Sequence, residues 1–144
     1  MTNRPVLCAV DVSNKDRDVG VLKQAARLAA MEGNRLDVVT VVPDFGLSIV
    51  GTFFERDHFD MAMKEARRLL DSLISTALGP EANAHVRHIV VSGNAYEEIL
   101  RIAEVDNAGL IVVGAHKPDF KDYLLGPNAA RIVRHSNCSV LVVR

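Results

Sequence analysis

Residues 109–144, GLIVVGAHKPDFKDYLLGPNAARIVRHSNCSVLVVR, contain the pattern that decides the fold. An apolar run, Leu110 to Val113, passes directly into Gly114, and a second glycine, Gly126, stands before a helical pattern. A second apolar run then closes the chain from Ser139 to Arg144. Continuous apolar runs are typical of strands covered on both faces of a parallel sheet. The stretch therefore predicts a strand, a loop, a helix and a strand of an α/β domain.

The loop between the two glycines has the features of a phosphate-binding loop. It leaves a buried strand and returns to a helix N-terminus, where Pro127 fits well because its missing N–H is not needed at the first helical position. The free N–H groups and the partial positive charge of a helix N-terminus favour an anionic phosphate. Gly114 allows close approach of the backbone to a ligand, and Lys117 adds a positive charge.

The rest of the chain alternates strand and helix patterns. Further strands are predicted at Pro5 to Val10, at Leu36 to Val42 and, as an edge strand, at His85 to Val91. Helical spacing of apolar residues predicts helices at about 16–32, at about 59–77 and after residue 94. Their predicted ends are Gly33-Asn34 and Gly79-Pro80, with Asn94 and Glu97 as a capping box. Five strands and four helices predict a parallel sheet with right-handed crossovers and helices on both faces.

A carboxylate follows the first predicted strand. Asp11 stands where that apolar run stops, and open α/β sheets bind ligands at the carboxyl ends of their strands. Val41, at the end of the second strand, would lie beside it, where an adenine can stack and use backbone groups. The other interpretation is that Asp11 or Ser13 only caps or shapes the following turn. The sequence leaves both interpretations open.

Composition limits the function classes. The chain has 144 residues, 49% of them hydrophobic, and a formal net charge of -1, which fits one domain and argues against disorder and against nucleic acid as the main partner. The sequence has neither a signal-peptide pattern nor an apolar run near the ~20 residues of a membrane span, so we expect a cytoplasmic protein. Cys8 and Cys138 are expected to be small core residues in a reducing compartment.

Three other features receive structural interpretations. Residues 43–55 form an apolar loop that can be a lid, a dimer contact or a flap over the core. His85 and His88, three apart on one predicted strand, would point to opposite faces and cannot bind one metal ion. The positive groups of the last helix, Arg131, Arg134 and His135, are expected near its C-terminus, where they complement the helix dipole. No metal site and no catalytic residue is predicted.

Several of these motifs together resemble the universal stress protein family. They are Val10-Asp11, Val41, Val-Val-Gly114-Ala-His, Leu-Leu-Gly126-Pro-Asn-Ala-Ala and the ending Cys-Ser-Val-Leu-Val-Val-Arg. Each motif alone is common, whereas their order and spacing are specific. The resemblance covers essentially the whole chain, which implies one universal stress protein domain over residues 1–144.

The resemblance implies a fold, a ligand and a partner. The fold is a doubly wound five-stranded parallel sheet of order 3-2-1-4-5, of the adenine nucleotide alpha hydrolase-like type. The ligand is ATP or AMP, with or without Mg²⁺, and the partner is a second copy joined through the last strand, Ser139 to Arg144. The implied nucleotide-binding residues are Val10, Asp11, Val12, Val41, Val113, Gly114, His116, Lys117, Gly126, Pro127, Asn128 and Ala129, with Asp11 and Val41 at ribose and adenine and the Gly126 segment at phosphate.

The chain departs from the ATP-binding pattern of the family, Gly-x2-Gly-x9-Gly followed by Ser or Thr. Its loop is one residue shorter, Lys117 replaces the second glycine, and Pro127 replaces the hydroxyl residue. Loss of one N–H and one O–H donor weakens phosphate binding by about 1–3 kcal/mol unless Lys117 or Asn128 compensates. The chain resembles a shorter-loop branch that can still bind adenine nucleotides.

Three functions follow as alternatives. The first is a nucleotide-binding stress-response regulator, a homodimer whose nucleotide occupancy changes its association with an unknown protein partner. The second is a slow ATPase or autokinase, with Asp11, His116 or Asp119 as acid-base groups. The third is a nucleotide-free interaction module. The sequence has no Walker motif and no nucleophile-base pair at diagnostic spacing, so we expect binding rather than catalysis.

Overall fold

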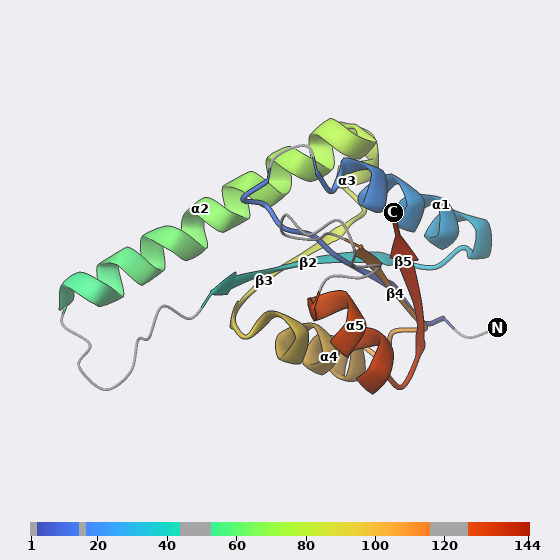
Figure 1. Ribbon diagram of the computed structural model, residues 1–144. Helices are drawn as coiled ribbons and strands as arrows, with labels where there is room; N and C mark the ends of the chain where they lie inside the picture. The colour runs from blue at the N-terminus through green and yellow to red at the C-terminus, as the bar shows by residue number, and fades with distance from the viewer. Residues whose placement is uncertain (1–2, 15–16, 44–52, 116–126) are drawn as a thin grey trace.

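The computed structural model describes residues 3–14, 17–43, 53–115 and 127–144, with the backbone alone at 53–55. Its strands are β1 (Val6–Ala9), β2 (Leu36–Pro43), β3 (Arg87–Gly93), β4 (Leu110–Gly114) and β5 (Ser139–Val143). Its helices are α1 (Val19–Glu32), α2 (Phe53–Leu78), α3 (Pro80–Asn83), α4 (Ala95–Val105) and α5 (Pro127–His135). The strands form one parallel sheet in the order β3-β2-β1-β4-β5, which confirms the predicted fold (Figure 1).

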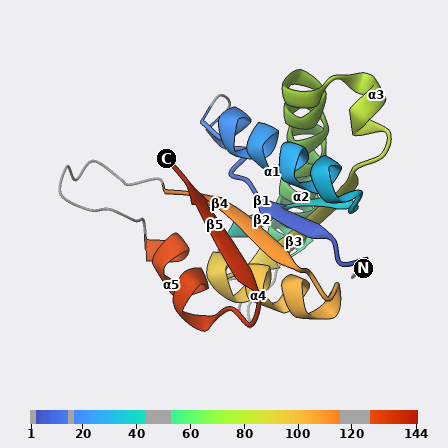
Figure 2. The ribbon, with the colours of Figure 1, turned by 90° about the vertical axis from the view of Figure 1, so that its right-hand side faces the viewer.

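Helices cover both faces of the sheet. Figure 2 shows α1 and α2 on one side of the strands and α4 and α5 on the other. The side chains of β1 alternate between these layers: Val6 and Cys8 pack with α1 and α2, whereas Leu7 packs with α4 and α5. All three are buried because β1 lies in the middle of the sheet, and this explains why its sequence is apolar without alternation.

The predicted helix signals are found where the sequence placed them. Gly33 ends α1 in the left-handed conformation with φ 66°, and Gly79 separates α2 from α3 with φ 91°. Asn94 caps α4, where its side chain accepts a hydrogen bond from the backbone N–H of Glu97 at 3.4 Å. The two cysteines are free, with Cys8 buried in β1 and Cys138 half-buried just before β5.

Several boundaries differ from the prediction. Pro80 starts a one-turn helix, α3, so the described residues contain five helices instead of four. Helix α2 begins at Phe53, inside the segment predicted to be an apolar loop, while residues 44–52 of that segment lie outside the described residues. Strand β3 begins at Arg87, so His85 precedes the strand and the argument that placed His85 and His88 on its opposite faces was wrong.

No helix in the described part of the chain is long and apolar enough to cross a membrane.

Two glycines allow a test of the left-handed end of α1. A Cβ added at Gly33 or at Gly20 would meet no atom within 4 Å. The two positions differ in backbone conformation, since Gly33 has a positive φ and Gly20 does not. We expect Gly33→Ala to lower the free energy of unfolding by about 1 kcal/mol, because an L side chain is strained in this conformation. Gly20→Ala, in the first turn of α1, should be neutral or stabilising. Urea unfolding of both variants measures the difference, and equal effects would contradict the explanation.

Candidate functional site

The strand order places the ligand-binding position expected of a doubly wound sheet, a crevice at the topological switch point, beside β1. From β1 the chain moves outward to β2 and β3, and then crosses to β4 and β5 on the other side of β1. The switch point of this fold is therefore between β1 and β4, at the carboxyl ends of the strands, where doubly wound sheets bind ligands. Asp11 leaves the end of β1 at this edge, and Gly114 ends β4 there.

Asp11 is held by its own turn. The backbone N–H and the hydroxyl of Ser13 donate hydrogen bonds to its Oδ1 at 2.9 and 2.6 Å, so the predicted turn-shaping role is present. Partial burial would raise the pKa of Asp11, but the hydrogen bonds from Ser13 and Asn14 and the charge of Arg17 outweigh it and hold the pKa below its usual value. Asp11 is exposed, so this edge presents a fixed, ionised carboxylate.

Asp18 supports this turn, and the sequence analysis missed it. Its side chain accepts a hydrogen bond from the backbone N–H of Asp11 at 2.6 Å, although Asp18 is only 2% exposed. Asp18 is also the N-cap position of α1, which begins at Val19 and not near residue 16 as predicted. An acidic residue directly before an apolar helical pattern was the available signal. Asp18 links the end of β1 to the start of α1 and thereby fixes where Asp11 lies.

The remaining predicted residues at the strand ends divide into two groups. Val10 and Val113 are 6% and 5% exposed and belong to the cores on opposite faces of the sheet, so only their backbone can face a ligand. Val12, Val41 and Gly114 are half-buried. Gly114 pairs with Val143 in extended backbone, and Val41 pairs with Val91. Val10 and Val113 are therefore assigned a backbone role at this position. Val12, Val41 and Gly114 are partly accessible there.

Helix α5 begins at the same edge, as predicted. Pro127 is its first residue, and Pro127 and Asn128 are exposed, whereas Ala129 is buried in the core at 4%. Ala129 therefore anchors the first turn and leaves the N-terminus of the helix open to an anion. The loop residues His116, Lys117, Asp119 and Gly126 lie outside the described residues.

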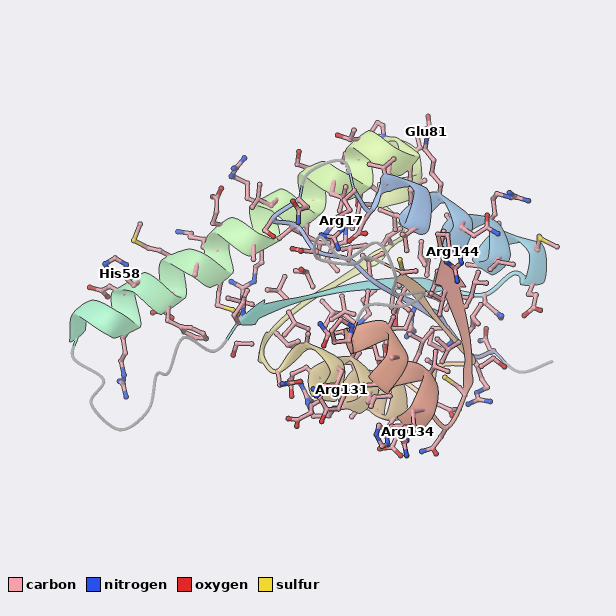
Figure 3. All side chains as sticks on the ribbon, viewed as in Figure 1. Arg17, His58, Glu81, Arg131, Arg134 and Arg144 are labelled. Atoms are coloured by element: carbon pink, nitrogen blue, oxygen red, sulfur yellow. The ribbon has the colours of Figure 1, made fainter. Side chains whose placement is uncertain are left out.

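The positive groups of α5 do not act as one set. Arg134 and His135 lie in the last turn, as the dipole argument predicts, but Arg131 lies earlier in the helix (Figure 3). Its guanidinium stands 4.9 Å from the ring centroid of Tyr96, near the start of α4. The prediction for Arg131 was therefore wrong. This contact ties the first turn of α4 to the middle of α5.

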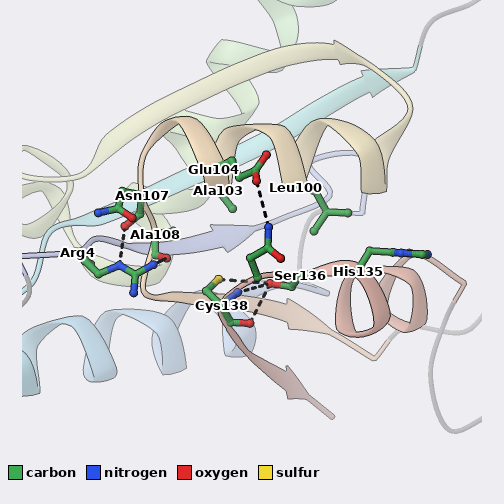
Figure 4. Close-up of a pocket in the computed structure, with 10 residues that line it drawn as sticks. Arg4, Leu100, Ala103, Glu104, Asn107, Ala108, His135, Ser136 and Cys138 are labelled. Atoms are coloured by element: carbon green, nitrogen blue, oxygen red, sulfur yellow. Dashed lines mark hydrogen bonds between the residues drawn. The ribbon is translucent and has the colours of Figure 1, made fainter.

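A second hollow, of about 460 Å³, lies at the opposite edge of the sheet (Figure 4). It is lined by Arg4, by the end of α4 and by residues 135–138. Its polar groups largely bind one another: Asn137 donates to Glu104 at 3.1 Å, and Arg4 donates to the carbonyls of Asn107 and Ala108 at 3.1 and 3.0 Å. Of the predicted site residues that the structure describes, none lines this hollow.

Comparison with known proteins gives the family. The model of the universal stress protein family matches residues 2–144. Universal stress protein G of Shigella flexneri is 35% identical over 98% of this chain and 99% of its own. Universal stress protein A homolog 1 of Coxiella burnetii is 32% identical over 99% of this chain and 97% of its own.

Solved structures share the fold. The hypothetical protein MJ0577 superimposes with a TM-score of 0.80 at 24% identity, over 99% of this chain and 96% of its own. A universal stress protein in complex with cAMP has a TM-score of 0.71 at 19% identity and covers 98% and 97% of the two chains. The universal stress protein of Archaeoglobus fulgidus in complex with dAMP has a TM-score of 0.65 at 20% identity, over the whole of both chains. Both the similarity in sequence over nearly the full length and the shared fold therefore show that the chain belongs to the universal stress protein family.

Proposed function

We propose that this protein is an adenine-nucleotide-binding regulator of the stress response, which acts in the cytoplasm and binds ATP or AMP at the crevice beside β1. One observation carries the proposal: the fixed carboxylate of Asp11 at the switch point, at the same edge of the sheet as the open N-terminus of α5. The complexes of two structural neighbours with cAMP and dAMP support the same ligand class.

The two ends of the site suit different parts of a nucleotide. An ionised carboxylate accepts hydrogen bonds from hydroxyl groups and repels phosphate, so Asp11 is assigned to the ribose. The start of α5 offers backbone N–H groups and a positive partial charge, so residues 127–129 are assigned to the phosphates, with Gly126, Lys117 and His116 leading into them. Val41 and Gly114 offer backbone groups at the edge, with Val41 assigned to adenine.

Partner association is the second part of the proposal. Strand β5 is an edge of the described sheet, and residues 140–143 are apolar and half-buried. The carbonyl of Val143 accepts a hydrogen bond from the N–H of Ala115 at 2.8 Å, so the backbone groups of Val143 face β4. Because this direction alternates from residue to residue along a strand, the backbone groups of Leu141 also face β4. The groups of Val140 and Val142 then point outward, where a second copy of the chain can pair with them. Nucleotide occupancy would change the association of this homodimer with a further, unknown protein partner.

The second candidate function is a slow ATPase or autokinase, and Asp11 is its acid-base candidate among the described residues. The low pKa of Asp11 favours an ionised acceptor over a proton donor, so binding fits this residue better than acid catalysis. The general test is mass spectrometry of small molecules that copurify with the native protein. An adenine nucleotide near one per subunit supports the proposal. Release of ADP that requires Mg²⁺ would favour the ATPase instead.

Gly126→Val tests the phosphate end of the site. A side chain next to the start of α5 should block the phosphates, and we expect calorimetry at millimolar ATP to show binding to the wild type and at least a tenfold loss in the variant. Gly33→Ala, at the end of α1, is the matched control and should bind normally. Unchanged affinity in Gly126→Val would mean that the loop is wrongly assigned, and no binding to the wild type would refute the proposed function.

Asp11→Ala tests the ribose end. The wild type should bind ATP about tenfold more tightly than 2′,3′-dideoxy-ATP, which lacks both ribose hydroxyls, and the variant should lose this preference. Asp18→Ala should weaken ATP binding by releasing the backbone N–H of Asp11, whereas Asp18→Asn keeps an acceptor and should bind more tightly than Asp18→Ala. An unchanged preference in Asp11→Ala would remove Asp11 from the site.

Val142→Pro tests pairing through β5. Proline removes an outward N–H without removing a hydrogen bond to β4, so we expect the dimer to dissociate to monomers in sedimentation velocity. Val142→Thr keeps the N–H and the branched Cβ and should remain dimeric. A dimer that survives in Val142→Pro with unchanged affinity would show that the interface is elsewhere.

A further inference from the structure

Four charged residues meet at the edge of the sheet opposite the candidate nucleotide site. Arg35 and Asp37 lie at the start of β2, Arg87 begins β3 and pairs with Asp37 in the sheet register, and Asp106 follows α4 as its C-cap residue. Sequence reasoning assigned no role to any of them. The cluster therefore joins three elements that are distant along the chain.

Asp37 is the centre of the cluster. Its side chain is completely buried, in register with Leu7 of β1 on one side and Arg87 of β3 on the other, and burial of a carboxylate is costly unless it is paired. Arg35 binds it with two hydrogen bonds, from Nε to Oδ1 at 2.7 Å and from Nη2 to Oδ2 at 3.0 Å. Arg87 Nη1 lies 3.6 Å from Oδ2, too far for a good hydrogen bond. Arg35 thus supplies the strong contacts to this carboxylate.

Asp106 has one satisfied and one unsatisfied oxygen. Arg87 Nη1 donates to its Oδ1 at 2.6 Å. Its Oδ2 is buried and has no hydrogen-bond partner among the described residues, and Arg35 Nη2 stands 3.9 Å from it. Arg4 donates instead to the carbonyls of Asn107 and Ala108. A buried acceptor without a donor is costly, and more so when it is charged, so this oxygen requires an explanation.

The arginines do not remove the repulsion between the two acids. The side chains of Arg35 and Arg87 are 51% and 52% exposed, so water screens their charges, whereas the two carboxyl groups are 0% and 8% exposed. The two carboxyl groups stand beside the same guanidinium atoms. Arg35 Nη2 lies 3.0 Å from Asp37 Oδ2 and 3.9 Å from Asp106 Oδ2, and Arg87 Nη1 lies 3.6 Å from Asp37 Oδ2 and 2.6 Å from Asp106 Oδ1. A proton on one of them turns a repulsion into a hydrogen bond and gives Oδ2 of Asp106 its donor.

We propose that Asp37 and Asp106 form a proton-binding site, in which one shared proton joins the two carboxyl groups and fastens the end of α4 to β2 and β3. The site responds to pH at the amino edge of the sheet and is separate from the nucleotide crevice.

The electrostatics of the pair agree with this arrangement. Burial raises the pKa of Asp37, and the hydrogen bond with Asp106 raises it further against the opposing effect of Arg35. Burial would also raise the pKa of Asp106, but hydrogen bonds with Asp37 and Arg87 outweigh it and lower the pKa. The pair therefore binds the proton as a unit, with the pKa of Asp37 raised and the pKa of Asp106 lowered.

The direction of the pH dependence follows from these shifts. The folded protein binds a proton at Asp37 more tightly than the unfolded chain does, because the pKa of Asp37 is raised in the fold. The stability that protonated Asp37 contributes is therefore complete below the ordinary pKa of Asp, about 3.9. This stability is lost as pH rises through the folded pKa of Asp37. Asp106 acts in the opposite direction: its contribution is present above the ordinary pKa and is lost as pH falls through its depressed pKa.

The direct experiment is a pH titration of the carboxyl ¹³C signals of the intact protein by NMR. Asp60, exposed on α2, is the site of the control substitution. We expect Asp37 to keep its proton above the ordinary pKa of an aspartate side chain, about 3.9, and Asp106 to lose its proton below that value. Titration of Asp37 at or below the ordinary pKa would overturn the proposal.

Asp106→Asn is the matched variant. Its amide oxygen can still accept from Arg87, and its amide NH₂ can donate to Asp37 in place of the shared proton. We expect the Asp37 titration to move to lower pH and the loss of urea stability with rising pH to diminish, while Asp60→Asn leaves both unchanged. An unchanged Asp37 titration in Asp106→Asn would overturn the shared proton. If Asp106→Asn does not fold, the wild-type titration alone decides the question.

Discussion

Burial of β1 between β2 and β4 is the constraint on which the rest of the structure depends. Val6 pairs with Leu36 on one side and with Leu110 on the other, so one short strand sets the register of both halves of the sheet. Because all five strands are parallel, their carboxyl ends meet at one edge. The exit of the chain from β1 at Asp11 is therefore fixed by core packing, and the candidate nucleotide site follows from it.

The two edges of the sheet use acidic residues differently. At the carboxyl edge, Asp11 is exposed and receives hydrogen bonds from Ser13, which keep it ionised and available to a ligand. At the amino edge, Asp37 is buried and faces another acid, which raises its pKa and favours the protonated form. The difference comes from solvent access and from the neighbouring groups, since the residue type is the same.

Much of the fold was predicted because its signals are local. Gly33, Gly79 and Asn94 act through backbone conformation or capping within a few residues, and each was found at its predicted place. The start of α5 at Pro127 was predicted for the same reason. The role of Asp18 was missed because its bond to Asp11 spans seven residues across a turn, and His85 was misplaced because strand ends depend on pairing with β2.

The sequence by itself determined the family, the alternation of strands and helices, and the order of the strands in the sheet that the family implies, since apolar runs, glycines and caps act through short-range sterics and burial. Only the tertiary structure decided that Arg131 lies on Tyr96, that Asp18 holds Asp11, and that Asp37 and Asp106 meet. These contacts join residues from different elements, up to 69 positions apart for the acid pair (106 − 37 = 69). Local pattern cannot reveal them, because distance along the chain carries no information about which side chains the packed layers bring together.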